Sequence, residues 1–433
     1  MIVPMQDVIE LAVAPDTRER LVRRFMRVRG RTMGLVATLS PEDQMIQSMQ
    51  DVSPSKWHLA HTTWFFETFV LSRYATGYTA FDERYGYLFN SYYTKFGCRH
   101  PRPHRGMLSR PSCDEVQRYR DHVNAACVRL IRQIPDEHLP ELARMLTLGF
   151  NHEQQHQELI LTDIKHVFWS NPLLPAYRMD QPQPLMTTAP QKWFEHHGGL
   201  IQIGVDADSA DFSFDNETPR HDTYVRPFRL AGRPVSCGEY REFIDAGGYD
   251  MPEYWLSDGW NEVETQEWRA PLYWHRQHGE WLVYTLAGVR PVIDSEPVCH
   301  VSFYEAAAYA AWAGKRLPTE AEWELFGRTQ MTDGNMQECG TLHPAASHCA
   351  GLGPWQMFGD VWEWTASPYT PYPGYRAPPG AVGEYNGKFM CNQMVLRGGS
   401  CATPGEHIRA TYRNFFPPNA RWQFSGIRLA EDL

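Results

Sequence analysis

The spacing of apolar residues changes near residue 175, and this change limits the possible folds more than any other feature of the chain. Before this point, four stretches have the apolar spacing of helices: 16–39, 57–74, 113–134 and 141–169. Four long helices predict a helix bundle. Beyond it, short apolar runs alternate with Gly, Pro, Asp and Trp, and only 302–314 and 319–328 have clear helical patterns. We therefore predict an α+β protein with two dissimilar halves.

The predicted boundary between the halves is a Pro- and Gln-rich segment at residues 174–192. A chain of 433 residues is long enough for two domains. We expect a four-helix bundle in residues 1–175, a linker in 176–195 and a second, loop-rich domain in 196–433.

The composition argues against several classes of protein. The net charge is -10 and no run of Lys or Arg offsets it, which argues against a nucleic-acid partner. No stretch approaches the roughly 18 apolar residues of a membrane span, and residues 1–15 lack the basic and apolar segments of a signal peptide. The nine cysteines are scattered and form no C-x-x-C pair. We expect a cytoplasmic protein without a disulfide framework.

Three histidines on two predicted helices form a candidate metal site. His152 and His156 lie four residues apart in the string H-E-Q-Q-H, so they share one helix face and can bind the same ion. His61 lies in the apolar string W-H-L-A-H, where a buried imidazole needs a partner. The alternative is that these are surface or hydrogen-bonded core histidines. Three imidazoles would leave about three coordination positions open, as in the facial triads of non-haem iron oxygenases.

The ligand set leaves the identity of the metal open. Without a carboxylate ligand, Fe(2+) keeps its full charge, which favours a substrate thiolate, because metal coordination deprotonates a thiol whose free pKa is about 8.5. Zinc accepts the same ligands, and H-E-Q-Q-H also satisfies the zinc-hydrolase pattern with Glu153 as general base. A hydrolase predicts no O2 consumption and loss of activity in Glu153→Gln. The iron site predicts that this substitution is tolerated and that His61→Ala is not.

Four strings in the second half resemble the formylglycine-generating-enzyme domain, a variant of the C-type-lectin-like fold. They are R-L-P-T-E-A-E-W-E at 316–324, G-D-V-W-E-W at 359–364, R-G-G-S at 397–400 and S-G-I-R-L-A at 425–430. Formylglycine-generating enzymes hold copper with two cysteines, at positions where this chain has Thr403 and Ile408. The resemblance therefore implies the fold but not formylglycine formation. Since many lectin-like domains only bind ligands, a non-catalytic binding module is a further alternative.

A DinB-like bundle that carries these histidines, fused to such a domain, resembles the ergothioneine sulfoxide synthases over nearly the whole chain. The resemblance implies Fe(2+) bound by His61, His152 and His156, whereas His58 matches no family ligand and is expected to pack. It implies an O2-dependent enzyme that couples C2 of hercynine to the thiol of cysteine or gamma-glutamylcysteine, with oxygenation of the sulfur. A related alternative is an ovothiol-type synthase, which sulfurises histidine at a different ring carbon.

The same resemblance places hercynine between the two domains. Gln155 matches a family residue that hydrogen-bonds the imidazole. Asn414 can donate to the carboxylate, and Phe415 or Phe416 can face the trimethylammonium group, a cation–π contact worth about 0.5–2 kcal/mol. The alternative for each Phe is core packing.

The remaining candidates lie between the second and third predicted helices. In one branch of the family a Tyr at the position of Tyr92-Tyr93 supplies an active-site phenol, while other members take theirs from the C-terminal domain. A phenol with a pKa near 10 stays protonated at neutral pH and can donate a proton. We predict Tyr93 as the donor with Tyr92 assisting. Arg105 and Arg110 are candidates to hold the carboxylate of the thiol substrate, with a solvated surface position as the alternative.

Overall fold

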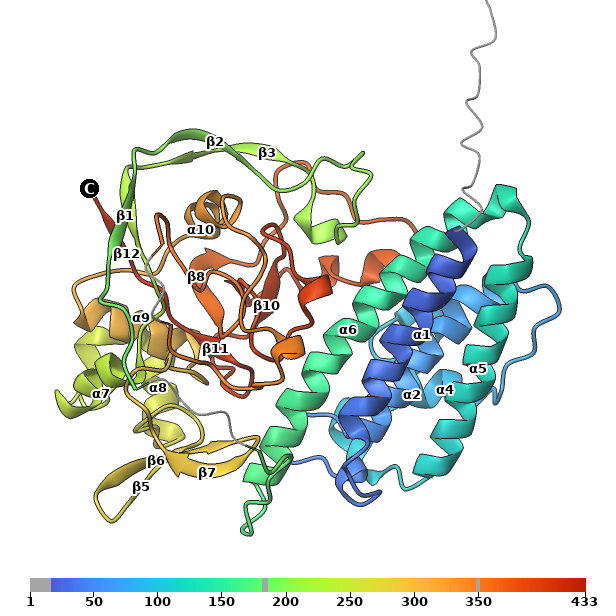
Figure 1. Ribbon diagram of the computed structural model, residues 1–433, viewed down its shortest axis with the longest axis horizontal. Helices are drawn as coiled ribbons and strands as arrows, with labels where there is room; N and C mark the ends of the chain where they lie inside the picture. Colours follow the sequence, from blue (N-terminus) through green and yellow to red (C-terminus); the bar gives the residue numbers. More distant parts are fainter. Residues whose placement is uncertain (1–16, 181–185, 348–350) are drawn as a thin grey trace, which may run out of the picture.

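The computed structural model describes residues 17–180, 186–347 and 351–433 (Figure 1). The predicted bundle (1–175) and linker (176–195) each extend beyond these ranges, over residues 1–16 and 181–185. The segment considered as a signal peptide also lies outside them. The two domain boundaries therefore stay a prediction.

Four long helices form the N-terminal half, as the apolar spacing predicted. They are α1 (Thr17–Val36), α2 (Ser55–Phe65), α5 (Cys113–Gln133) and α6 (Leu139–Trp169). Helix α2 continues through a π-helical turn, Phe66–Leu71, into the short α3, Ser72–Tyr74. All 11 residues of α2 are buried, because α1, α5 and α6 all pack against it. Because the helix is buried on every side, its polar side chains need partners inside the bundle.

The segment between α3 and α5 packs against the bundle and carries several of the predicted site residues. It contains α4 (Tyr85–Phe89) and two 3-10 turns, Thr94–Phe96 and Arg102–Met107. Helix α5 then begins at a capping box, in which the Ser112 hydroxyl accepts the backbone N–H of Glu115.

The described residues of the second half form four small sheets. One sheet has the order β10 (Asn414–Phe416), β9 (Met394–Arg397), β8 (Trp362–Pro368) and β11 (Ser425–Gly426). A second consists of β1 (Trp193–His196), β4 (Phe228–Ala231) and β12 (Ala430–Asp432). The ribbon of β2 (Gly199–Ile203) and β3 (His221–Val225) and the meander of β5 (Trp274–Gln277), β6 (Glu280–Thr285) and β7 (Gly288–Pro291) complete them.

Helices α9 (Phe303–Trp312) and α10 (Glu320–Gly327) match the two helices predicted in this half. The structure also contains α7 (Cys237–Asp245) and α8 (Ser257–Thr265), which the sequence analysis did not predict. Helix α7 has a sequence signal that was overlooked, since Ser236 and Glu239 form a capping box at its start.

Helix α6 joins the two halves, and Figure 1 shows it between the rest of the bundle and the C-terminal domain. Its buried Glu158 accepts hydrogen bonds from Trp362 and Ser400, both at 2.7 Å. Further along, Lys165 Nζ lies 2.7 Å from His300 Nε2. The helix that carries two predicted metal ligands therefore also forms the contact with the second domain. Within the described residues, none of the helices has the length and apolar character needed to cross a bilayer.

Candidate active site

The three predicted ligands converge at the centre of the bundle. His61 comes from α2, and His152 and His156 lie one turn apart on α6; their candidate ligand atoms all fall within 4.8 Å of one another. All three side chains are buried. Burial is the main cause that lowers the pKa of each imidazole, to about 3 for His152. The rings are therefore neutral near pH 7, which is the form that binds a metal.

The arrangement of the ring nitrogens fits a single divalent ion. Nε2 of His61 and Nε2 of His152 lie 3.2 Å apart. Nδ1 of His61 donates to the backbone oxygen of Phe89 at 2.6 Å, which leaves its Nε2 free to bind a metal. Neutral nitrogens this close, in a buried setting, could serve as the donor set of a three-histidine metal centre.

His58 does more than pack, which corrects the expectation from the sequence. Its Nδ1 lies 2.8 Å from Nδ1 of His156, and its Nε2 lies 2.9 Å from a carboxylate oxygen of Asp163. Helix α2 therefore supplies the candidate ligand His61 and also His58, the hydrogen-bond partner of the candidate ligand His156. The sequence held a signal for this pair: Asp163 follows His156 by seven residues, or about two helical turns, on the same face of α6.

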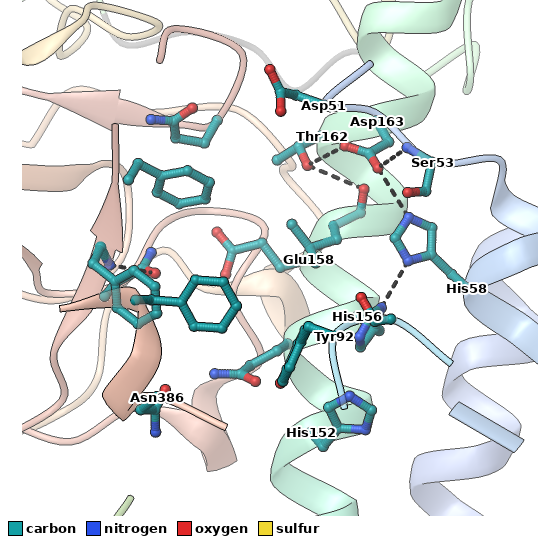
Figure 2. Close-up of a pocket in the computed structure, with 18 of the residues that line it drawn as sticks. Asp51, Ser53, His58, Tyr92, His152, His156, Glu158, Thr162, Asp163 and Asn386 are labelled. Carbon is teal, nitrogen blue, oxygen red and sulfur yellow. Dashed lines mark hydrogen bonds and ion pairs between the residues drawn. The ribbon is translucent and has the colours of Figure 1, made fainter. Parts of the chain in front are cut away.

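A cavity of about 260 Å³ lies next to the histidines, between α6 and the second domain. Figure 2 shows the side chains of α6 and of the segment around Tyr92 on one side and those of the C-terminal domain on the other. Predicted residues on its wall are His152, His156, Gln155, Tyr92, Arg105, Asn414, Phe415 and Phe416. Wall residues that the sequence analysis missed include Tyr385, Asn386 and Glu158.

Strand β10 forms part of the wall that the second domain contributes to the cavity. The Phe415 ring stacks on Tyr369 with centroids 4.0 Å apart, and Phe416 packs edge-on against Trp422. The side-chain oxygen of Asn414 accepts the backbone N–H of Phe415 at 2.9 Å, so its amide nitrogen is available as a donor to a ligand.

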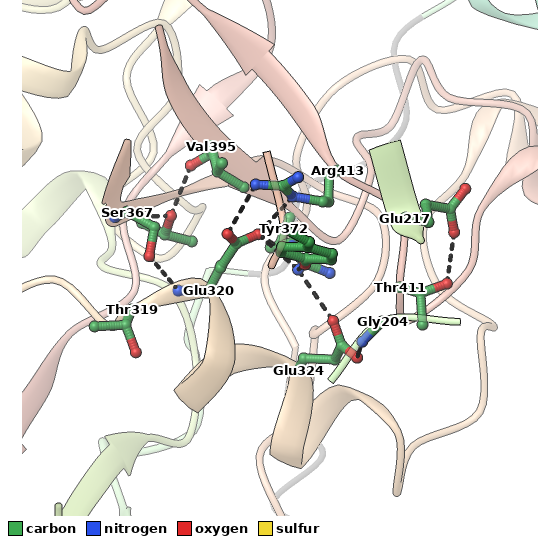
Figure 3. A network of polar contacts seen from close by, with 12 residues as sticks. Gly204, Glu217, Thr319, Glu320, Glu324, Ser367, Tyr372, Val395, Thr411 and Arg413 are labelled. Carbon is green, nitrogen blue, oxygen red and sulfur yellow. Dashed lines mark hydrogen bonds and ion pairs between the residues drawn. The ribbon is translucent and has the colours of Figure 1, made fainter. Parts of the chain in front are cut away.

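A buried ionic network anchors this strand. Arg413 makes two hydrogen bonds to the Glu320 carboxylate, at 2.9 and 3.0 Å (Figure 3). Arg397 donates to the same carboxylate at 2.8 Å. Paired guanidinium–carboxylate bonds of this kind set orientation as well as distance, so α10 holds the backbone next to Asn414 in place.

Gln155 connects the two domains at the cavity. Its Nε2 donates to the Tyr412 hydroxyl at 2.7 Å, and its Oε1 accepts a hydrogen bond from the Tyr385 hydroxyl. The Tyr385 ring lies 5.7 Å from the ring of His152. No motif in the surrounding loop indicated Tyr385, so this C-terminal phenol near the metal ligands became visible only in the structure.

The two adjacent tyrosines have different surroundings. Tyr92 lines the cavity, whereas Tyr93 is not among the residues that line it. The Tyr93 ring is buried against Trp64 and Phe69, and its hydroxyl lies 3.4 Å from that of Tyr92. Burial raises the pKa of both phenols, so both stay protonated at neutral pH. Tyr92 therefore lies at the cavity and Tyr93 behind it, and which of the two phenols donates a proton stays a prediction.

The two candidate arginines also differ. Arg105 is 4% exposed, lines the cavity and stacks on Trp57 at 3.3 Å. It donates to the hydroxyls of Ser53 and Ser91, and in the described ranges it forms no ion pair with a carboxylate. Burial, and then the nearby Arg102, lower its pKa well below the ordinary value. Arg110 is exposed, donates only to the Ser109 backbone and does not line the cavity, so it is not brought to the site.

Glu153 points away from the cavity, although it follows a candidate ligand directly. Its buried carboxylate accepts hydrogen bonds from Arg29 at 2.9 Å, Arg120 at 3.0 Å and Thr32 at 2.7 Å. Burial raises its pKa, but the two arginines and the Thr32 hydroxyl outweigh burial and lower the pKa to about 2. A carboxylate held in this way cannot act as general base on a ligand in the cavity.

The fold and the site together define a class of two-domain protein, in which a helical bundle presents three buried imidazoles to a loop-rich domain. Residues 24–160 match the DinB superfamily, and residues 183–338 and 329–433 match the Sulfatase-modifying factor enzyme 1-like domain. These matches confirm the predicted α+β fold, a DinB-like bundle joined to a formylglycine-generating-enzyme-like domain.

Curated relatives extend the similarity over both domains. The chain is 32% identical to the Hercynine oxygenase of Mycolicibacterium smegmatis, over 96% of this chain and 99% of the relative. It is 33% identical to the Hercynine oxygenase of Mycobacterium tuberculosis, again over 96% and 99%. The Formylglycine-generating enzyme of Streptomyces coelicolor is 29% identical over 54% of this chain and 87% of its own length. The chain belongs to the hercynine oxygenase family.

Proposed function

We propose that this protein is an Fe(2+)-dependent sulfoxide synthase of ergothioneine biosynthesis. In the proposed reaction, hercynine, a thiol and O2 give the coupled sulfoxide and one water. A C–S bond forms at C2 of the imidazole, one oxygen atom goes to sulfur, and the C2 and thiol hydrogens leave with the second oxygen atom as water. The thiol is cysteine or gamma-glutamylcysteine. We place the enzyme in a reducing cytoplasm, where the cysteines of the described residues, all of them free, would stay reduced.

One observation carries the proposal: a buried set of three neutral imidazoles next to a cavity between the domains, in a chain of the hercynine oxygenase family. His61, His152 and His156 would hold the iron. The bound Fe(2+) would supply sites for the thiolate and O2 and the redox chemistry between them. The protein's own residues would position the substrates, keep water out and deliver protons.

The second domain would bind hercynine. The Asn414 amide can donate to its carboxylate, and Phe415 and Phe416 offer aromatic faces to the trimethylammonium group. Gln155 can face the imidazole from the α6 side. Because Arg413 and Glu320 anchor this strand, the ligand would meet a preformed wall.

Arg105 would hold the carboxylate of the thiol substrate. A buried guanidinium without an anionic partner in the described ranges is electrostatically unfavourable until an anion binds. Its two serine contacts and the Trp57 face fix its direction.

Tyr92 would donate the proton that reduced oxygen requires, and Tyr93 would support the Tyr92 hydroxyl. This assignment follows from exposure to the cavity, because Tyr92 lines it. The Tyr385 phenol is also near, but its hydroxyl donates to Gln155. Without the donor, we expect the thiol to react with both oxygen atoms and form a sulfinate.

The related ovothiol-type reaction would use histidine, which lacks the trimethylammonium group. Phe415 and Phe416 would then have no trimethylammonium cation to contact. The zinc-hydrolase alternative requires Glu153 at the metal, and that carboxylate is bound by Arg29 and Arg120. We therefore do not favour either alternative.

The test is an anaerobic reconstitution with Fe(2+), followed by one thiol, one imidazole substrate and air. The two thiols are tested against hercynine and against histidine, and products are identified by mass. Coupled sulfoxide from hercynine supports the proposal. Product only from histidine would favour the ovothiol-type enzyme, and no product from any pair would reject the sulfoxide-synthase function.

A further inference from the structure

The three candidate ligands differ in the hydrogen-bond partners of their Nδ1 atoms. Nδ1 of His61 donates to the uncharged backbone oxygen of Phe89, and Nδ1 of His152 has no hydrogen-bond partner in the described part of the chain. Nδ1 of His156 instead meets His58, which in turn meets Asp163 (Figure 2). His156 is therefore connected to the ionisable carboxylate of Asp163 through a second imidazole, that of His58.

We propose that Asp163, acting through His58, is the group that positions His156 and sets its tautomer. In this way a carboxylate outside the coordination sphere would partly replace the carboxylate that a three-histidine ligand set lacks. The inference rests on the proposed metal centre and assigns positioning roles to two residues that the site description left without a function.

Helix geometry brings the three groups into line. His156 and Asp163 are two turns apart on α6, and the His58 ring from α2 lies between them. The side chains of His58 and Asp163 are 3% and 4% exposed. The Asp163 oxygen that meets His58 also accepts the backbone N–H of Ser53 at 2.8 Å, so its position is set from two sides.

The hydrogen-bond roles follow from the chemistry of the groups. A carboxylate only accepts, so Nε2 of His58 must carry its proton. For Nε2 of His156 to bind a metal, its Nδ1 must carry the proton and donate, and Nδ1 of a neutral His58 can accept that hydrogen bond. Nε2 of His156 then has its lone pair free for the metal. A ligand imidazole that donates to such a partner is held in one orientation and becomes a stronger base.

The experiment compares the full-length wild type with His58→Phe and Asp163→Asn. The Asn variant can keep the oxygen that accepts from His58 and Ser53 and removes only the charge. The control is His166→Gln, which removes a half-buried imidazole of the same helix, α6, that hydrogen-bonds Ser48 and lies outside the cavity. Affinities for Fe(2+) and Co(2+) are measured anaerobically by competition with a chelator, and the Co(2+) absorption spectrum reports the ligand geometry. Circular dichroism and thermal unfolding of the metal-free proteins check that each variant folds.

We expect about a 100-fold loss of metal affinity in His58→Phe and about a tenfold loss in Asp163→Asn, with a changed Co(2+) spectrum in both and no change in the control. An unchanged affinity and spectrum in a folded Asp163→Asn protein would overturn the inference, even if His58→Phe binds weakly or fails to fold, because His58 would then only fill space. A wild type that binds neither metal would instead reject the proposed metal centre.

Discussion

The substitution Glu153→Gln separates the two functions that the H-E-Q-Q-H string allows. In the structure, the Glu153 carboxylate forms ion pairs with Arg29 at 2.9 Å and Arg120 at 3.0 Å, in the core of the bundle. Removal of one charge from a buried ion pair typically costs about 3–5 kcal/mol, because the remaining charge is left without a partner. The substitution is therefore expected to lower the stability of the bundle and leave the cavity unchanged. The expectation that coupling activity tolerates this substitution stays a prediction, and the structure adds an expected loss of stability.

The lowered pKa gives a second measure of the same contribution. The pKa of Glu153 falls from an ordinary value of 4.5 to about 2. By linkage this difference corresponds to about 3 kcal/mol. Because the folded pKa lies below the unfolded one, this stability is present above pH 4.5 and is lost as the pH falls toward 2. The cost expected from breaking the ion pair and the contribution expected from the pKa difference agree in size and sign.

The assay is thermal and denaturant unfolding of the metal-free proteins, together with coupling activity at low temperature. A loss of 3–5 kcal/mol lowers the melting temperature of a domain this size by roughly 6–20 °C. The control is Glu19→Gln, whose exposed ion pair with Arg132 should contribute less than about 1 kcal/mol. The reasoning is refuted if Glu153→Gln unfolds like the wild type and yet loses all activity, because Glu153 would then act chemically.

Three further predictions concern the cavity itself. Arg105→Met should raise the KM for the thiol at least about 30-fold, as expected when one partner of a buried charge pair is removed. The exposed Arg110→Met should leave this KM unchanged. Equal effects of the two substitutions in steady-state kinetics would contradict the proposed binding of the thiol carboxylate by Arg105. Tyr92→Phe should divert product from sulfoxide to sulfinate, and Tyr93→Phe should do so less; product ratios by mass decide, and unchanged coupling in Tyr92→Phe would exclude it as the donor. His61→Ala should lose most of the bound iron in metal analysis after desalting, and full retention would remove it from the ligand set.

The sequence predicted the parts of the site that depend on local periodicity. His152 and His156 are four positions apart, and any helix with that spacing places both rings on one face. The apolar surroundings of His61 likewise indicated a buried ring that needs a partner. The metal ligands could therefore be proposed before any coordinates.

Contacts between distant segments could not be read in this way. Helical spacing puts Glu153 on a different face from its neighbour His152, but it does not reveal that Arg29 and Arg120 occupy that face. Tyr385 reaches Gln155 from a loop 230 residues away, and no local pattern marks such a contact.

By itself, the sequence determined the two kinds of domain, the long helices of the bundle and the residues that could bind a metal, because each follows from local chemistry along the chain. Only the tertiary structure decided that Tyr92 lines the cavity while Tyr93 packs behind it, that Arg105 is buried while Arg110 is exposed, and that His58 connects His156 to Asp163. The physical reason is that periodicity sets the direction in which a side chain points, whereas its partner depends on which distant segment packs against that face.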